Sequence, residues 1–132
     1  MLMHTKILMT LSAVLMAIIG FAASFFPQEI LAYADAWDEL FEVTLVQVLG
    51  ALYLGFAALN WTSRASLIGG IYSRPVAIAN FMHAGIVTAI LGKIVIANHQ
   101  VIPVVAAAIV YGIFALWFGA VLFSHPKHND QE

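Results

Sequence analysis

Long apolar segments alternate with short polar connections along this chain. Four runs contain no Asp, Glu, Lys or Arg: Ile7–Phe26, Val43–Ser63, Pro75–Gly92 and Val101–Ser124. A helix of roughly 20 apolar residues, rising about 1.5 Å per residue, crosses a bilayer core of about 30 Å. Lipid cannot satisfy a free backbone, and the runs lack the alternating polarity of barrel strands. The pattern therefore predicts four transmembrane helices, at about residues 5–26, 42–63, 75–97 and 101–124.

The first apolar run has some features of a signal peptide, because Lys6 precedes it and small residues follow Gly20. A signal peptide's apolar region, however, is typically about 7–15 residues long, and this run is longer. We therefore expect an uncleaved first span.

Pro75 is expected in the first turn of the third span, where its missing N–H would be unpaired in any case.

Composition strengthens the membrane prediction. The 132 residues are 63% hydrophobic and 9% charged, with a mean hydropathy of +0.97, whereas about 25% of residues are charged in soluble domains. We expect one transmembrane domain over residues 1–132, with the lipid bilayer as its solvent. The formal charge of -2 and the lack of a basic patch argue against a nucleic-acid partner. The lack of cysteine excludes thiol–disulfide chemistry and thiolate metal sites.

The basic residues predict an orientation. If the spans alternate in direction, Lys6, Arg64, Arg74 and Lys127 fall on one side, and Lys93 falls towards the other. The side richer in Lys and Arg is cytoplasmic. We therefore expect both termini and the loop between Arg64 and Arg74 to be cytoplasmic.

The connection between the first two spans is acidic. Five of the seven acidic residues fall between Pro27 and Glu42. Asp35, Asp38, Glu39 and Glu42 have the spacing of one helical face. The opposite face would carry Ile30, Tyr33, Trp37, Leu40 and Phe41. This pattern predicts a short amphipathic helix on the outer membrane surface, or an extension of the second span. The acidic face could bind a divalent cation or a basic partner, but a solvated face is the simpler interpretation.

Small residues recur at helical spacing in the spans, and such faces let membrane helices approach closely. The members are Ala13, Ala17, Gly20 and Ser24; Ala51, Gly55, Ala58 and Thr62; Ala84, Thr88 and Gly92; and Ala108, Gly112, Ala115 and Gly119. We expect these faces to pack inside the protein. The predicted fold is an all-α, antiparallel four-helix bundle, with the short amphipathic helix outside it.

Polar residues within the spans are the default functional candidates in a membrane protein. The candidate buried polar site comprises Gln47, Asn80, His83 and Tyr111. His83 could bind haem or a metal, or relay a proton. The simpler interpretation is a hydrogen bond to Gln47, Asn80 or Tyr111. The four apolar runs contain no carboxylate, and the chain has no hydrolase, zinc-protease or P-loop motif. We therefore expect neither an enzyme nor a resident cofactor.

The inner loop combines aromatic and basic residues. Trp61 and Tyr72 suit the membrane interface, and Arg64 and Arg74 suit anionic headgroups. The same residues could contact a protein partner. Gly69 and Gly70 provide a turn between the two arginines.

Four segments of the second and third spans and the loop between them form a recognisable set: Gly50–Phe56, Asn60-Trp61, Gly69–Pro75 and Asn80–His83. In these segments the chain resembles a group of small, uncharacterised four-span bacterial membrane proteins. The resemblance implies a bacterial inner membrane and places Asn60, Arg74, Asn80 and His83 in a recurrent pattern. It implies no activity.

Three functions are compatible with these features. The first is a non-enzymatic accessory or assembly subunit that packs against itself or a larger membrane protein. The second is a minimal channel or carrier for a small solute, lined by Gln47, Asn80 and His83. The third is a haem- or metal-binding membrane subunit that uses His83.

Overall fold

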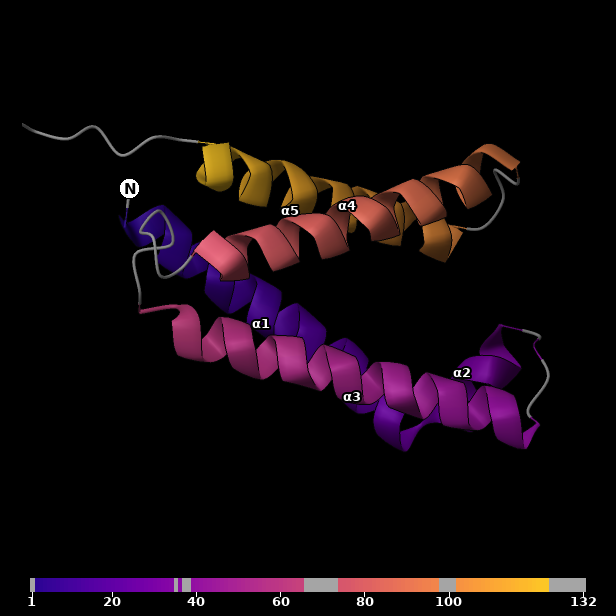
Figure 1. Ribbon diagram of the computed structural model, residues 1–132. Helices are drawn as coiled ribbons and strands as arrows, with labels where there is room; N and C mark the ends of the chain where they lie inside the picture. Colours follow the sequence, from indigo (N-terminus) through magenta and orange to yellow (C-terminus); the bar gives the residue numbers. More distant parts are fainter. Residues whose placement is uncertain (1, 35, 37–38, 66–73, 98–101, 124–132) are drawn as a thin grey trace, which may run out of the picture. The chain divides into compact units, whose positions relative to one another are not determined.

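A computed structural model of the chain describes residues 2–34, 36, 39–65, 74–97 and 102–123. These residues are all-α, without a strand among them (Figure 1). The helices are α1 (Leu2–Phe25), α2 (Pro27–Tyr33), α3 (Leu40–Ser63), α4 (Arg74–Ala97) and α5 (Ile102–Phe123). The four helices α1, α3, α4 and α5 are long and apolar enough to cross a membrane. The all-α prediction is confirmed, and the helix ends lie close to those expected for the spans.

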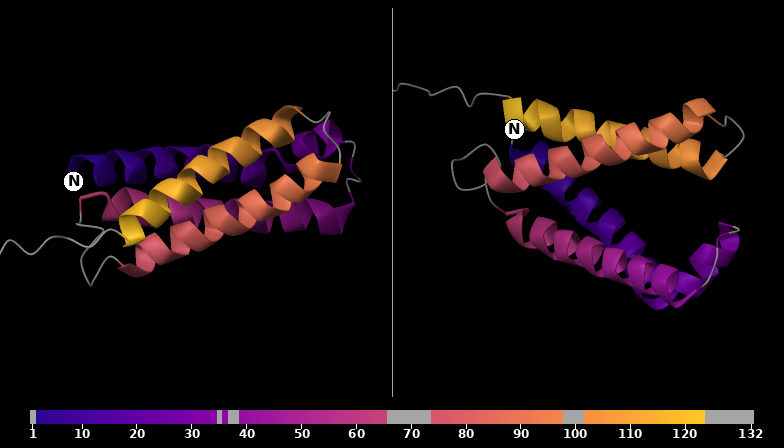
Figure 2. Two further views of the ribbon diagram at one scale, coloured as in Figure 1. Left: turned by 90° about the horizontal axis from the view of Figure 1, so that it is seen from above. Right: turned by 45° about the vertical axis from the view of Figure 1, so that its right-hand side comes forward.

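The chain divides into two compact units, each built on a helical hairpin (Figure 2). Residues 9–64 form one unit, with α2, α3 and most of α1. Residues 1–8 and 65–132 form the other, which contains α4 and α5. We refer to them as the α1–α3 hairpin and the α4–α5 hairpin. A four-helix bundle within a single domain would unite the two, and it stays a prediction.

Pro27 separates α1 from α2. The residue before a proline is driven away from the α region, and Phe26 has φ -128° and ψ 45°. Proline itself suits the first turn of a helix, so α2 begins at Pro27. The Phe26 N–H still donates to the Ala22 carbonyl over 2.8 Å. The chain can therefore change direction with little loss of backbone hydrogen bonding.

The predicted outer helix is only partly present. A helix does follow α1, but it ends at Tyr33, and Ala36 and Glu39 are not helical. Glu39 is the extended N-cap of α3, so it shares no helical face with Glu42. The prediction of one acidic helical face is therefore wrong, and its members Asp35 and Asp38 lie outside the described residues.

Glycines bring α1 and α3 into close, antiparallel contact. A Cβ built on Gly20 would lie 2.8 Å from the backbone nitrogen of Leu54 and 2.9 Å from the carbonyl oxygen of Gly50. A Cβ on Gly50 would lie 2.6 Å from the Ser24 nitrogen. Only glycine permits such an approach at these positions. The two helices lie side by side in both sets of views (Figures 1 and 2).

The small-residue face expected on α3 does not lie against α1. Gly55, its expected centre, is exposed, and a Cβ there would meet nothing within 4 Å. The buried residues of α3 are Gly50, Ala57 and Asn60. Gly50 and Gly55 are five residues apart, or about 140° around a helix of about 3.6 residues per turn. A contact at Gly50 therefore turns Gly55 away from α1.

The α4–α5 hairpin follows the predicted pattern more closely. A Cβ on Gly112 would lie 3.6 Å from the Thr88 methyl group, and one on Gly119 would lie 3.1 Å from the Phe81 ring. Two expected members of the α5 face therefore lie against α4. Phe81 also contacts Phe123, with ring centroids 6.0 Å apart and nearly perpendicular rings. These pairs run in opposite directions along the two helices, so the hairpin is antiparallel.

Candidate functional site

The α1–α3 hairpin contains a buried polar cluster. Asn60 is fully buried, and Ser12 is 2% exposed. The Asn60 side-chain amide donates to the Ser12 hydroxyl over 2.9 Å and approaches the Met16 sulfur at 3.6 Å. An interhelical hydrogen bond of this kind contributes about 0.6–2 kcal/mol in a membrane. The cluster therefore fixes α3 against α1 at the end opposite to α2.

Asn60 is among the residues singled out from the sequence, whereas Ser12 is not. Ser12 lies four residues before Met16, and the two share a face of α1 with a sulfur–hydroxyl distance of 4.0 Å. A buried serine in an apolar span needs a partner, which is the signal that could have identified it. The amide of Asn60 is the matching group on α3.

Gln47 belongs to the same hairpin but lies at its other end. Its side-chain amide donates to the Ser24 carbonyl oxygen over 3.4 Å, and Gln47 itself is exposed. This contact joins α3 to the last turn of α1. The structure thus places Gln47 among the helix–helix contacts of the α1–α3 hairpin.

The other candidates for the buried polar site lie in the α4–α5 hairpin. His83 and Tyr111 meet edge to face, with ring centroids 5.9 Å apart and an interplanar angle of 66°. Tyr111 is 6% exposed and Asn80 is fully buried. The Asn80 amide donates to the Val76 carbonyl oxygen of its own helix over 2.9 Å. The structure therefore brings His83 and Tyr111 together through an aromatic contact, and the expected hydrogen bond from His83 stays a prediction.

Of the basic and aromatic residues expected at the inner loop, the structure describes Trp61, Arg64 and Arg74. The Arg64 guanidinium carbon lies 3.5 Å from the centroid of the Trp61 ring, and its Nη1 donates to the Trp61 carbonyl over 3.1 Å. This is a cation–π pair at the end of α3. Arg74 is exposed in the first turn of α4, and Tyr72 lies outside the described residues.

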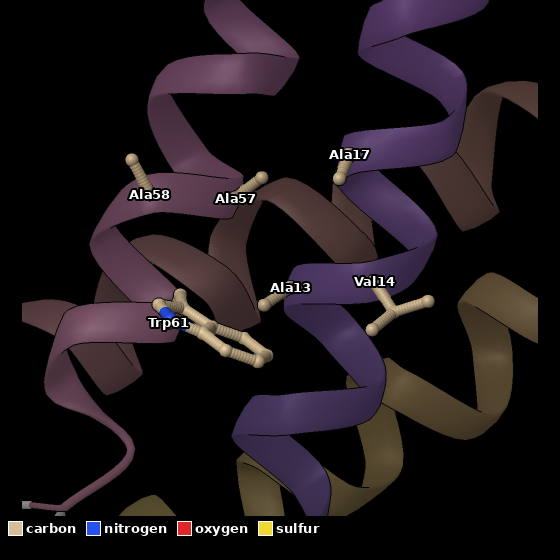
Figure 3. A pocket seen from close by; sticks show the side chains of 6 residues that line it. All are labelled: Ala13, Val14, Ala17, Ala57, Ala58 and Trp61. Carbon is tan, nitrogen blue, oxygen red and sulfur yellow. The ribbon is translucent and has the colours of Figure 1, made fainter.

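An apolar groove lies between α1 and α3, next to Trp61 (Figure 3). Its volume is about 300 Å³, and its lining comprises Ala13, Val14, Ala17, Ala57, Ala58 and Trp61. Figure 3 shows the Trp61 ring reaching from α3 towards α1 and bounding one end. Alanines form the groove because they leave the space that larger side chains would fill. A second apolar groove of about 450 Å³ lies at the other end of the hairpin, between Ile18, Ile30 and Tyr53.

The described part of the chain contains no group of three or more His, Asp or Glu side chains placed to hold an ion. The chain has no cysteine. The tail histidines His125 and His128 lie outside the described residues.

The fold and the candidate sites define an all-α protein with four helices of membrane-spanning length and composition. Comparison with known proteins adds no family to this description: no family model, curated protein or solved structure matches the chain.

Proposed function

We propose that this is a small, non-enzymatic multi-pass protein of the bacterial inner membrane, with both termini in the cytoplasm. It acts as an accessory or assembly subunit that associates with itself or with a larger membrane protein. Four helices of spanning length support the membrane location. The positions of Lys6, Arg64, Arg74 and Lys127 support the orientation.

The use of the polar side chains is the observation that carries the subunit proposal. Asn60 bonds to Ser12, Gln47 to Ser24, and Asn80 to its own helix. The first two contacts join α3 to α1, and the third lies within α4, so each of these groups already serves a helix or a pair of helices. A carrier lined by Gln47, Asn80 and His83 gains no support from these contacts.

The outward surfaces of the hairpins are apolar and suited to lipid or to other helices. Large side chains such as Leu52 on α3, Ile86 on α4 and Leu116 on α5 are 59%, 53% and 78% exposed. Membrane helices associate through van der Waals packing and interhelical hydrogen bonds. A small protein of this kind has most of its surface available for such packing.

Site-specific photo-crosslinking in intact membranes tests the proposal. A photoreactive residue at Leu116, which is 78% exposed, should crosslink to a second copy or to another membrane protein. The same residue at Phe118, which is 1% exposed, is the matched control on α5 and should give far less. Crosslinks to lipid alone from Leu52, Ile86 and Leu116 would contradict the subunit role. Release of the protein by alkaline extraction would contradict the membrane location.

A further inference from the structure

The groove beside Trp61, lined by the six residues named above, has the dimensions of a site for one hydrocarbon chain. Its volume of about 300 Å³ lies at the lower end of the range of about 300–1,000 Å³ for small-molecule pockets. The lining has no charged side chain. An unbranched apolar chain therefore fits it better than a polar metabolite or a complete lipid molecule.

A fixed positive charge lies at the end of this groove. Trp61 lines the groove, and the Arg64 guanidinium stacks over the same Trp61 ring at 3.5 Å. The hydrogen bond from Arg64 to the Trp61 carbonyl further restrains the guanidinium. Stacking on an aromatic ring leaves the edge of a guanidinium able to donate to phosphate oxygens.

The acidic residues described in this hairpin lie far from Arg64. They are Glu29, Glu39 and Glu42, all near the connection between α2 and α3. Glu42 precedes Arg64 by nearly the whole of α3, which is about 33 Å at about 1.5 Å per residue. The Arg64 end of the hairpin is therefore electrostatically suited to an anion.

We propose that this groove binds one acyl chain of an anionic phospholipid, whose phosphate is held by Arg64. The inference rests on the proposed membrane location, in which Arg64 lies at the cytoplasmic interface. The order of features matches such a lipid: an apolar groove, an aromatic ring at interface depth and then a cation. A second copy of this chain in the same orientation is a poorer occupant, because it would bring its own Arg64 to the same depth and the two positive charges would repel each other.

Fluorescence quenching by brominated lipids tests the proposal. Trp37→Phe and Trp117→Phe together leave Trp61 as the only tryptophan. This protein is reconstituted with phosphatidylglycerol or phosphatidylcholine that is brominated on the acyl chain near the glycerol. Quenching of Trp61 should show about fivefold preference for phosphatidylglycerol, the effect of one basic residue at a lipid surface.

Two variants separate the chain site from the headgroup site. Arg64→Gln should abolish the preference between the two lipids while both still quench. Ala58→Leu should reduce quenching by both, because it fills a groove position that is exposed and can accept the larger side chain. Ala51→Leu is the matched control, since Ala51 is also exposed on α3 and lies outside the groove. It should leave quenching unchanged.

Each alternative outcome is decisive. Equal quenching by the two lipids would overturn the proposal and indicate ordinary contact with bulk lipid. The absence of quenching in a membrane-inserted protein would also overturn it, because protein would then cover the groove. Resistance to alkaline extraction is measured on the same samples. The lipid site can therefore fail while the proposed membrane location stands.

Discussion

Substitution of Gly50 by alanine should force α1 and α3 apart. The added methyl group would lie 2.5 Å from the Ser24 hydroxyl oxygen, 2.6 Å from its nitrogen and 2.9 Å from the Ala23 carbonyl carbon. Two of these three atoms are backbone, so no rotamer change can remove the clash. Overpacking of this kind destabilises proteins by about 1–3 kcal/mol. The better helix propensity of alanine offsets up to about 1 kcal/mol of this.

Gly55→Ala provides a control on the same helix. A methyl group there would meet nothing within 4 Å. Its effect should therefore range from neutral to a gain of up to about 1 kcal/mol, from helix propensity alone. The free energies of unfolding of the two variants should differ by about 2 kcal/mol. This comparison cancels the propensity term, because both substitutions are Gly→Ala in the interior of α3.

The assay is an unfolding titration in mixed micelles, in which SDS is increased and helicity is followed by far-ultraviolet circular dichroism. Gly50→Ala should shift the midpoint to lower SDS, and Gly55→Ala should leave it in place or raise it. Equal midpoints for the two variants would refute the close crossing of α1 and α3 at Gly50. A large loss for Gly55→Ala alone would restore the small-residue face expected from the sequence.

Three further predictions address the polar contacts and the orientation. A double-mutant cycle of Asn60→Leu and Ser12→Ala should give a coupling energy of about 0.6–1.7 kcal/mol in the SDS titration, because one interhelical hydrogen bond joins the pair; additive effects would contradict that bond. The His83→Leu variant should remain folded. The His83→Ala variant should be less stable than His83→Leu by about 1 kcal/mol, because alanine leaves a void beside the Tyr111 ring; equal SDS midpoints for these two variants would contradict this packing role. Reporter fusions after Asp35 and after Lys127 should give opposite signals, since the first is expected outside and the second in the cytoplasm; a cytoplasmic signal at Asp35 would contradict the orientation.

The helices themselves could be predicted because bilayer thickness and backbone hydrogen bonding leave few choices for long apolar runs. Pro75 lies in the first turn of α4, as expected, and the first span ends next to Pro27, which begins α2. The helical faces were harder to predict. In an apolar span, lipid-facing and protein-facing residues have similar polarity, so α3 offered no contrast to distinguish Gly50 from Gly55.

The polar residues were easier to identify from the sequence than their partners. His83 was expected to hydrogen-bond to a neighbour such as Tyr111, and the structure places the two rings edge to face. The partner of Asn60 was not predicted, because a serine in a membrane helix can also bond to its own backbone. Thr88 does so, donating to the Ala84 carbonyl oxygen over 2.7 Å. Sequence periodicity alone cannot decide between an interhelical and an intrahelical partner.

The location of these contacts has a consequence for assembly. Asn60, Gln47 and Asn80 each bond within their own hairpin, and a group used in this way has less to offer another protein. Selectivity for a partner would then depend on the shape of the apolar faces and on the charged ends of the helices. Trp61 and Arg64 combine an apolar face with a charged helix end, since Trp61 lines the apolar groove and Arg64 carries a positive charge at the end of that groove. Binding of a lipid there would change the face that α1 and α3 offer to a neighbouring helix, and lipid composition could thereby influence assembly.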